Sequence, residues 1–347
     1  MTRRAVPENP SNRAGRPDIP RRLGTNRGPR SSPTTELRMR RTASTRLAVA
    51  LAGALSIAAG CSVMRPLAKI GPLQEQQFVM DRDDALDATV HLSYWSGRLR
   101  VRPGDAARAA RLHTRDNLDE VDAHADARRT GEHLEVRLWL DSDDSLINFR
   151  SWQAEERAPD AIDPKSTVIN EWDLELAEGM PLALDCELAA CDADLDLGGL
   201  LLRRAKIEIG GGHLVVDFAK PQEGRLERLE FDCGAGNLVA RRIGNAHART
   251  ILVDVGAGSC ELDLSGEWKE DALVHVDSGA ANVEIRVPRG LAVRVDLKDK
   301  VFAEFSARDF RSEGDKRYTS PDWGMGGPSI VVEIEATLGH VGFGITQ

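Results

Sequence analysis

The chain has 347 residues, of which 46 are lysine or arginine and 55 are aspartate or glutamate, giving a formal net charge of -9. Residues 1–60 hold 12 of the basic and 3 of the acidic residues, so the rest of the chain carries a net charge of -18. This charge excludes a nucleic-acid binder, which needs a basic surface for phosphate. It suits a body that stands off an anionic membrane and concentrates cations around itself.

The first 60 residues predict an export signal and no folded domain. Residues 1–38 contain nine arginines and six prolines without apolar periodicity, and such a segment cannot bury enough surface to fold. We interpret it as upstream sequence wrongly included in the gene, the alternative being a long disordered start of the signal. Residues 39–60 are predicted to be the signal peptide, because a basic start precedes a 13-residue apolar run that is too short to span a bilayer.

Cys61 directly follows this apolar run. The sequence Ala58-Ala59-Gly60-Cys61 resembles the lipobox of bacterial lipoproteins, in which the cysteine thiol accepts a diacylglycerol and a peptidase cleaves just before it. We therefore predict lipidation at Cys61, with acyl chains such as palmitate holding the protein to a membrane. The alternative is an ordinary signal peptide followed by a chance cysteine. Ser62 at the next position favours the outer membrane if the host has two membranes.

Residues 61–83 are expected to form a tether, and a β-rich part is expected over 84–181. Apolar and polar residues alternate there, as in Val90 to Tyr94, which is typical of half-buried strands. A short helix is predicted around 105–111, and a polar surface loop over 151–168.

Residues 182–347 are predicted to form a β-solenoid-like stack, so the fold class is mainly β. Small triplets begin at five positions, with spacings of 21, 24, 22 and 23 residues. A period near 22 with two strands per repeat suits coils stacked about 4.8 Å apart, with glycine at each corner. The polar residue after each triplet is expected to satisfy backbone groups at the corner. The triplets begin at Ala189, Gly210, Gly234, Gly256 and Gly279, and the polar residues are Asp192, His213, Asn237, Ser259 and Asn282.

Four cysteines remain beyond Cys61, an even number that permits two disulfides in an oxidising compartment. Cys233 and Cys260 both fall on inward positions of neighbouring coils, and Cys186 and Cys191 lie on either side of one turn. These two pairings are one interpretation. The other is four buried free thiols that pack as small apolar groups.

No motif in the sequence points to catalysis, a cofactor or a metal. Asp192, Asp194 and Asp196 alternate with apolar residues, which indicates a strand with an acidic face and not an EF-hand loop. The glycine triplets recur at the repeat period, and none is followed by the lysine and serine or threonine of a phosphate-binding loop. Trp268 and Trp323 lie near turns and are the candidates for contact with a sugar or a protein.

Several segments of the sequence resemble the toast-rack domain family. They are Asn170 to Leu176, Gly179 to Leu184, Leu195 to Leu200, the glycine-rich repeats, and the closing segment Pro328 to Gly344. The resemblance covers most of 84–347 and implies a stacked β architecture without established catalytic residues. Relatives in this family are bacterial, membrane-associated and adhesin-like, and some belong to cell-wall stress responses.

The sequence therefore predicts a non-catalytic cell-envelope lipoprotein that acts as a structural, adhesion or stress-related binding module. Its expected partners are the membrane, reached through the lipid anchor, and an envelope protein or glycan. It would face the periplasm or lie at the cell surface. The alternative is a glycan-active β-solenoid enzyme of the envelope, because some solenoids hold rows of acidic residues in a groove.

Overall fold

The computed structural model describes residues 70–119, 121–142, 168–300, 303–314 and 316–346. All of them belong to one compact unit that spans 53–347. Strands dominate these residues, and the helical element among them is the short 3-10 helix η1, Ile243–Ala246. The predicted mainly β fold is therefore confirmed. The predicted signal peptide, Cys61 and nearly all of the predicted loop over 151–168 lie outside the described residues.

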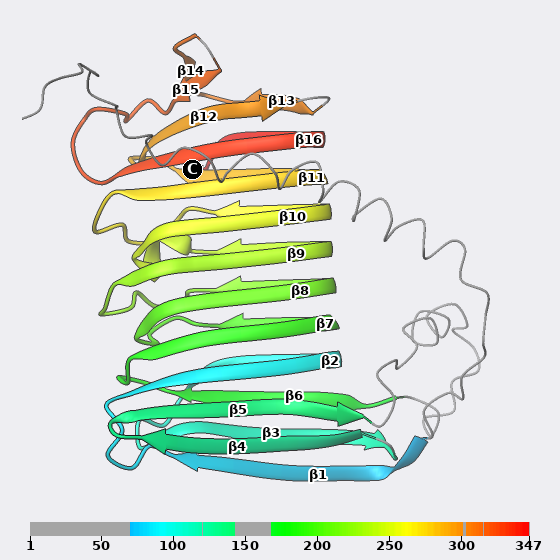
Figure 1. Cartoon of the computed structure of the whole chain (residues 1–347). Coiled ribbons are helices and arrows are strands. Elements are labelled where there is room, and N and C mark those ends of the chain that lie inside the picture. Colours follow the sequence, from blue (N-terminus) through cyan, green and yellow to red (C-terminus); the bar gives the residue numbers. More distant parts are fainter. Residues whose placement is uncertain (1–69, 120, 143–167, 301–302, 315, 347) are drawn as a thin grey trace, which may run out of the picture. The chain divides into compact units, whose positions relative to one another are not determined.

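Seven long strands stack in parallel and form the body of the fold (Figure 1). Each is 15 to 18 residues long. In stacking order they are β2 (Asp87–Gly104), β7 (Leu182–Asp196), β8 (Leu202–Asp217), β9 (Leu226–Arg241), β10 (Ala248–Asp263), β11 (Ala272–Pro288) and β16 (Ser329–Thr346). We call each of these strands a rung.

Each rung bends in its middle, at the small triplet. In β9, burial alternates over Leu229, Phe231 and Cys233, stops over the triplet, and resumes with the opposite parity at Leu238 and Ala240. Because the buried residues on both sides of the triplet join one core cluster, the two halves of a rung face each other across it. We call them the first arm and the second arm.

The five predicted triplets lie in register along one edge of the stack. Their middle residues are paired rung to rung, in the order Ala190, Gly211, Ala235, Ala257 and Ala280. Rungs β2 and β16 extend this row with Ser96 and Leu338. The period near 22 residues is thus the distance along the chain from one rung to the next.

Glycine is needed at the corner because neighbouring rungs approach so closely there. A Cβ atom on Gly258 would lie 2.0 Å from the carbonyl oxygen of Gly236, and the φ of Gly258 is +123°. A Cβ on Gly234 would lie 2.8 Å from the carbonyl oxygen of Gly210. Only a residue without a side chain fits these positions.

The apolar columns predicted from the repeat fill the interior. Leu229 pairs with Ile251, and Phe231 with Val253, and each of the four side chains is at most 1% exposed. Burying one such side chain stabilises a fold by about 1.5–3 kcal/mol before entropy is counted. The column of small and large apolar residues therefore holds the rungs together.

At one end of the stack the next layer consists of separate strands. β5 (His133–Ser142) pairs with the first arm of β2, and β6 (Asn170–Ala177) pairs with its second arm. Beyond β5 lies β4 (Val121–Thr130), and beyond β6 lie β3 (Arg108–Leu118) and then β1 (Ile70–Asp81), all antiparallel.

Two expectations for this end need correction. A tether was expected over 61–83, but residues 70 to 81 form the strand β1. This edge strand buries only Met80, so its sequence lacks the alternating pattern that would have indicated a strand. The helix expected around 105–111 is wrong, because β3 starts at Arg108 and its backbone pairs with both β1 and β6.

At the other end the last strand of the chain lies inside the sheet. β16 sits between β11 and β12 (Ala292–Lys300), although β12 precedes it in the sequence. β12 pairs with the first arm of β16, and β13 (Glu304–Ala307) with its second arm. The short strands β14 (Arg311–Ser312) and β15 (Arg317–Thr319) follow beyond β12.

Candidate functional site

The four cysteines beyond Cys61 are free thiols, and all are buried. Cys233 lies on the first arm of β9 and Cys260 on the second arm of β10, so both point inward on neighbouring rungs, as predicted, but from opposite arms. Burial raises the pKa of Cys233 to about 11, and burial together with the Cys233 thiol raises that of Cys260 to about 12. Such thiols are weak nucleophiles at neutral pH. Disulfide formation by Cys186, Cys191, Cys233 and Cys260 stays a prediction.

The polar residues that follow the triplets form a column on the outer face of the second arms. In strand pairing it runs through Asp192, His213, Asn237, Ser259 and Asn282. The Ser259 hydroxyl donates to Oδ1 of Asn237 at 2.7 Å. This bond joins side chains of neighbouring rungs, where the sequence predicted bonds to the corner backbone.

The three aspartates of β7 form a strand with an acidic face, as predicted. Asp192, Asp194 and Asp196 face outward, and the apolar residues between them are buried. Strand pairing places Asp192 beside Arg98 and Asp194 beside Arg100 of β2. Within the described parts of the chain, no group of three or more His, Cys, Asp or Glu side chains is arranged to hold a metal ion.

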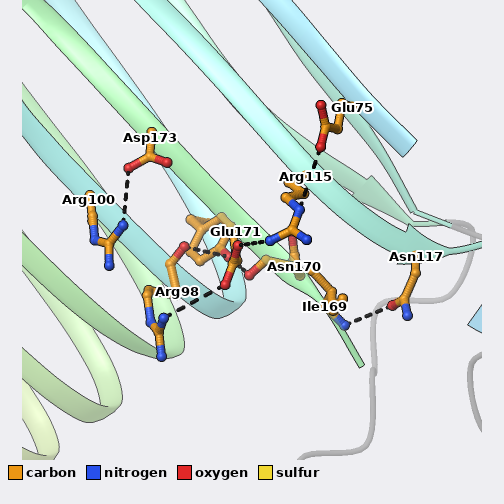
Figure 2. A network of polar contacts seen from close by, with 10 residues as sticks. Glu75, Arg98, Arg100, Arg115, Asn117, Ile169, Asn170, Glu171 and Asp173 are labelled. Atoms are coloured by element: carbon orange, nitrogen blue, oxygen red, sulfur yellow. Dashed lines mark hydrogen bonds and ion pairs between the residues drawn. The ribbon is translucent and has the colours of Figure 1, made fainter. Parts of the chain in front are cut away.

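A block of alternating charge covers the outer face where β2, β6 and β3 meet (Figure 2). Arg98 and Arg100 of β2 contact Glu171 and Asp173 of β6, with N–O distances of 3.7 and 3.8 Å. Arg115 of β3 contacts Glu171 from the other side at 3.2 Å. Exposed ion pairs each contribute about 0–1 kcal/mol, so the block adds little to stability.

The first arms carry an acidic column on their outer face. Six carboxylates follow one another on neighbouring rungs, about 4.8 Å apart in the strand ladder. They are Glu187, Glu208, Asp232, Asp254, Asp277 and Glu335. Lys206 pairs with Glu208. A row of like charges makes this face strongly negative, in line with the solvated acidic face expected from the sequence.

A buried polar cluster anchors the start of β6 (Figure 2). The Tyr94 hydroxyl donates to the carbonyl oxygen of Asn170 at 2.8 Å, and Nδ2 of Asn170 donates to the carbonyl oxygen of Ser96 at 2.6 Å. The backbone N–H of Ile169 donates to Oδ1 of Asn117 at 2.7 Å. These bonds position the strand that lies beside the second arm of β2.

Asp116, paired with Asn170 in this region, is only 5% exposed. Burial raises its pKa, and Asp122 adds to this effect, while the backbone N–H of Leu118 opposes it. A carboxyl whose folded-state pKa is raised destabilises the fold when it is charged, so folding becomes more favourable as the pH falls through that pKa.

Asp116→Asn is therefore expected to raise the free energy of unfolding at pH 7, because the amide carries no charge that burial would penalise. Urea denaturation followed by circular dichroism measures this difference. At pH 3 the wild-type carboxyl is protonated, so the two proteins should be equally stable there. A gain of equal size at both pH values would contradict the assignment.

The two tryptophans selected from the sequence have different surroundings. The guanidinium carbon of Arg294 lies 5.3 Å from the ring centroid of Trp323, a cation–π contact within the chain. Trp268 is half-buried and lines a pocket of about 200 Å³. The ring of Trp323 is thus already in contact with Arg294, whereas the ring of Trp268 borders a pocket that a ligand could enter.

Three successive segments build this pocket at the edge where one rung leads into the next, and the middle one includes the start of β10. The β8–β9 loop contributes residues 223–225, the β9–β10 segment 247–249, and the β10–β11 loop 268–270. Arg225 contacts Glu270 at 3.1 Å and so ties the first of these loops to the third. Of the pocket residues, only Trp268 was predicted from the sequence. The three segments do recur at nearly the same period as the triplets, and this spacing could have indicated that they lie side by side.

His247 is the buried polar member of the pocket lining. Its side chain is 5% exposed, and its backbone has a φ of +47°, which few non-glycine residues adopt. Neither ring nitrogen makes a hydrogen bond of normal geometry among the described residues. Burial and the nearby Lys269 lower its pKa, while Glu267 and the carbonyls of Gly224 and Gln222 act in the opposite direction.

No helix in the described segments has the length and hydrophobicity needed to cross a bilayer. An open stack of parallel rungs in register, with apolar columns inside and charged columns outside, defines a β-solenoid-like repeat protein. The family model described as the N-terminal domain of toast_rack, DUF2154, matches residues 69–239. Residues 69–239 thus match the toast-rack family, as the resemblance of the sequence predicted.

Solved structures with a similar arrangement are distant in sequence. A protein of Clostridium sporogenes named a putative cell adhesion protein is 16% identical, with 79% of this chain and 100% of that chain covered and a TM-score of 0.42. A putative adhesin of Bacteroides fragilis is 10% identical, with 78% and 97% covered and a TM-score of 0.34. No curated protein matches the sequence.

Proposed function

We propose that the chain is a non-catalytic binding module of the cell envelope, held to a membrane by lipid on Cys61. The observation that supports the binding role is the fixed register of the rungs. Parallel pairing holds every outward column of polar and charged side chains in place along the stack. A surface that is already ordered loses little entropy on binding, and repeat proteins use such extended surfaces for recognition.

The proposal of a non-catalytic role is supported by the surroundings of the thiols and of several carboxylates among the described residues. The four thiols are buried with raised pKa values. Carboxylates of the β6 face are held by arginines, and Glu270 of the pocket is paired with Arg225. If the protein cleaved peptidoglycan or another polysaccharide, release of reducing ends would overturn this part of the proposal.

The lipid anchor is proposed from the sequence around Cys61. Eight residues separate Cys61 from the first residue of β1. That length of chain spans at most about 28 Å when fully extended. A lipid on Cys61 would therefore hold the β1 end of the stack close to the membrane, on the outer membrane if the host has two, as Ser62 favours.

Metabolic labelling with a palmitate analogue tests the anchor. In a bacterial host, the wild-type chain is expected to incorporate label and to sediment with membranes. Cys61→Ser is expected to lose all label, because it lacks the acceptor thiol. Equal labelling of the two proteins would contradict lipidation at Cys61.

Sedimentation with purified envelope material tests the binding role. The unlipidated Cys61→Ser protein, incubated with isolated sacculi and with membranes, is expected to bind at least one of the two in a saturable manner. The same protein unfolded by heat is the control, because it has the same charge but no ordered surface. Absence of binding by the folded protein to both materials would overturn the proposed function.

A further inference from the structure

We propose that the pocket around Trp268 binds an acidic saccharide. This inference rests on the proposed binding function and names the ligand class of one site within it. The pocket combines three features: two cations without an ion pair among the described residues, an aromatic ring, and a buried histidine whose ring nitrogens make no hydrogen bond of normal geometry there.

The cations select a ligand with a negative charge. Arg249 and Lys269 are exposed, line the pocket, and make no ion pair among the residues that the structure describes. Arg225, by contrast, is neutralised by Glu270 at 3.1 Å and Glu227 at 3.6 Å. The carboxylate of Glu223 also lines the pocket, so the five charged lining residues together carry one net positive charge. The planar guanidinium of an arginine matches the two oxygens of a carboxylate.

The aromatic ring selects a ligand with an apolar face. Nε1 of Trp268 donates to the carbonyl oxygen of Leu264 at 2.8 Å, which fixes the orientation of the indole. A Cβ on Gly244 would lie 2.9 Å from Cδ1 of Trp268, so the ring packs directly on this glycine. A rigid indole that borders a pocket offers an apolar surface for the C–H face of a sugar ring.

The buried histidine selects a ligand with hydroxyl groups. A buried polar side chain without a partner is costly, and such groups in native proteins commonly mark functional positions. Because its pKa is lowered, His247 is neutral at pH 7, with one ring nitrogen that donates and one that accepts. A sugar hydroxyl both donates and accepts, so it satisfies either nitrogen.

A simple anion and a neutral sugar each use fewer of these groups. A simple anion such as phosphate would leave the face of Trp268 without a partner, and a neutral sugar would leave Arg249 and Lys269 unpaired. An acidic saccharide satisfies the ring, the cations and His247 together. Its acid could be the carboxylate of a uronic acid or the lactyl carboxylate of muramic acid.

Isothermal titration of the full-length Cys61→Ser protein tests the inference. The probes are tetragalacturonate, a disaccharide that contains N-acetylmuramic acid, and neutral chitotetraose. At least one acidic probe is expected to bind tenfold or more tightly than the neutral one, and the two acidic probes distinguish the two sources. Equal affinity for all three, or no binding of either acidic probe, would overturn the proposal.

Two matched double variants locate the site. Arg249→Gln with Lys269→Gln is expected to weaken binding of the acidic probe by tenfold or more. Arg308→Gln with Arg311→Gln removes the same charge from exposed arginines outside the pocket lining and is expected to bind as the parent does. Trp268→Phe keeps a ring and is expected to weaken binding less than Trp268→Ala. If both double variants bound equally well, the assignment to this pocket would be wrong.

The two proposals fail in different ways. Sedimentation with envelope material, without binding of any acidic probe, would overturn the pocket assignment and leave the binding module standing. Binding of an acidic probe at the pocket, without sedimentation with either material, would overturn the proposed function alone.

Discussion

Gly258→Ala is expected to lower the free energy of unfolding by about 4 kcal/mol, at the upper end of single substitutions. The new methyl carbon would lie 2.0 Å from the carbonyl oxygen of Gly236, and the φ of +123° disfavours any side chain. Neither rung can retreat, because each is paired on both sides. Urea denaturation followed by circular dichroism measures the loss.

Gly290→Ala is the matched control for this effect. Gly290 also has a positive φ, of +84°, but no atom lies within 4 Å of the position of its Cβ. The control therefore carries only the backbone cost, about 1–2 kcal/mol. Equal losses in the two variants would show that the close approach of neighbouring rungs is not what excludes a side chain at Gly258.

Phe231→Ala is expected to cost about 3–5 kcal/mol, because it opens a cavity in the middle of an apolar column. Phe231 is 1% exposed and pairs with Ile207 on one side and Val253 on the other. The neighbouring variant Asp232→Ala changes a side chain on the outer face, and is expected to change stability by about 0.5 kcal/mol or less.

The comparison of these two adjacent positions tests which residues of the first arm face inward and which face outward. Thermal unfolding of both variants beside the wild type is sufficient for the measurement. A larger loss for Asp232→Ala than for Phe231→Ala would mean that the inward and outward faces of β9 have been exchanged.

The stack could be predicted from sequence because its physical requirements recur. Gly234 and Gly256 meet the carbonyl oxygen of the rung before them, and Gly210 and Gly279 do the same, so four successive rungs need glycine at the same place. Apolar residues such as Leu229 and Ile251 recur for the same reason, since each packs on its counterpart in the next rung. A constraint repeated at one period is visible in a single sequence.

The ends of the stack could not be predicted in this way, because their constraints are not repeated. β1 buries only Met80, so its sequence carries no alternation that marks a strand. The pairing of β16 with β11 and β12 depends on long-range contacts, and a local sequence pattern does not predict it. For this reason the closing segment could be identified as strand while its neighbours in the sheet could not.

The pocket could be predicted from the sequence only in part. Trp268 could be selected as a contact residue because it stands near a turn. His247 could not, because its burial and its lack of a hydrogen-bond partner depend on three loops that meet only in the folded chain. The same limit applies to Cys233 and Cys260: their inward direction could be predicted from the repeat, but not the opposite arms on which they lie.

The position of β16 has a consequence for how the chain is made. Synthesis delivers residues in order, so β12 emerges before the strand that must separate it from β11. Until the final residues arrive, the backbone edges of both strands stay open to other chains and to proteases. A chain that lacks the final residues would therefore leave β11 and β12 without the strand that pairs with both.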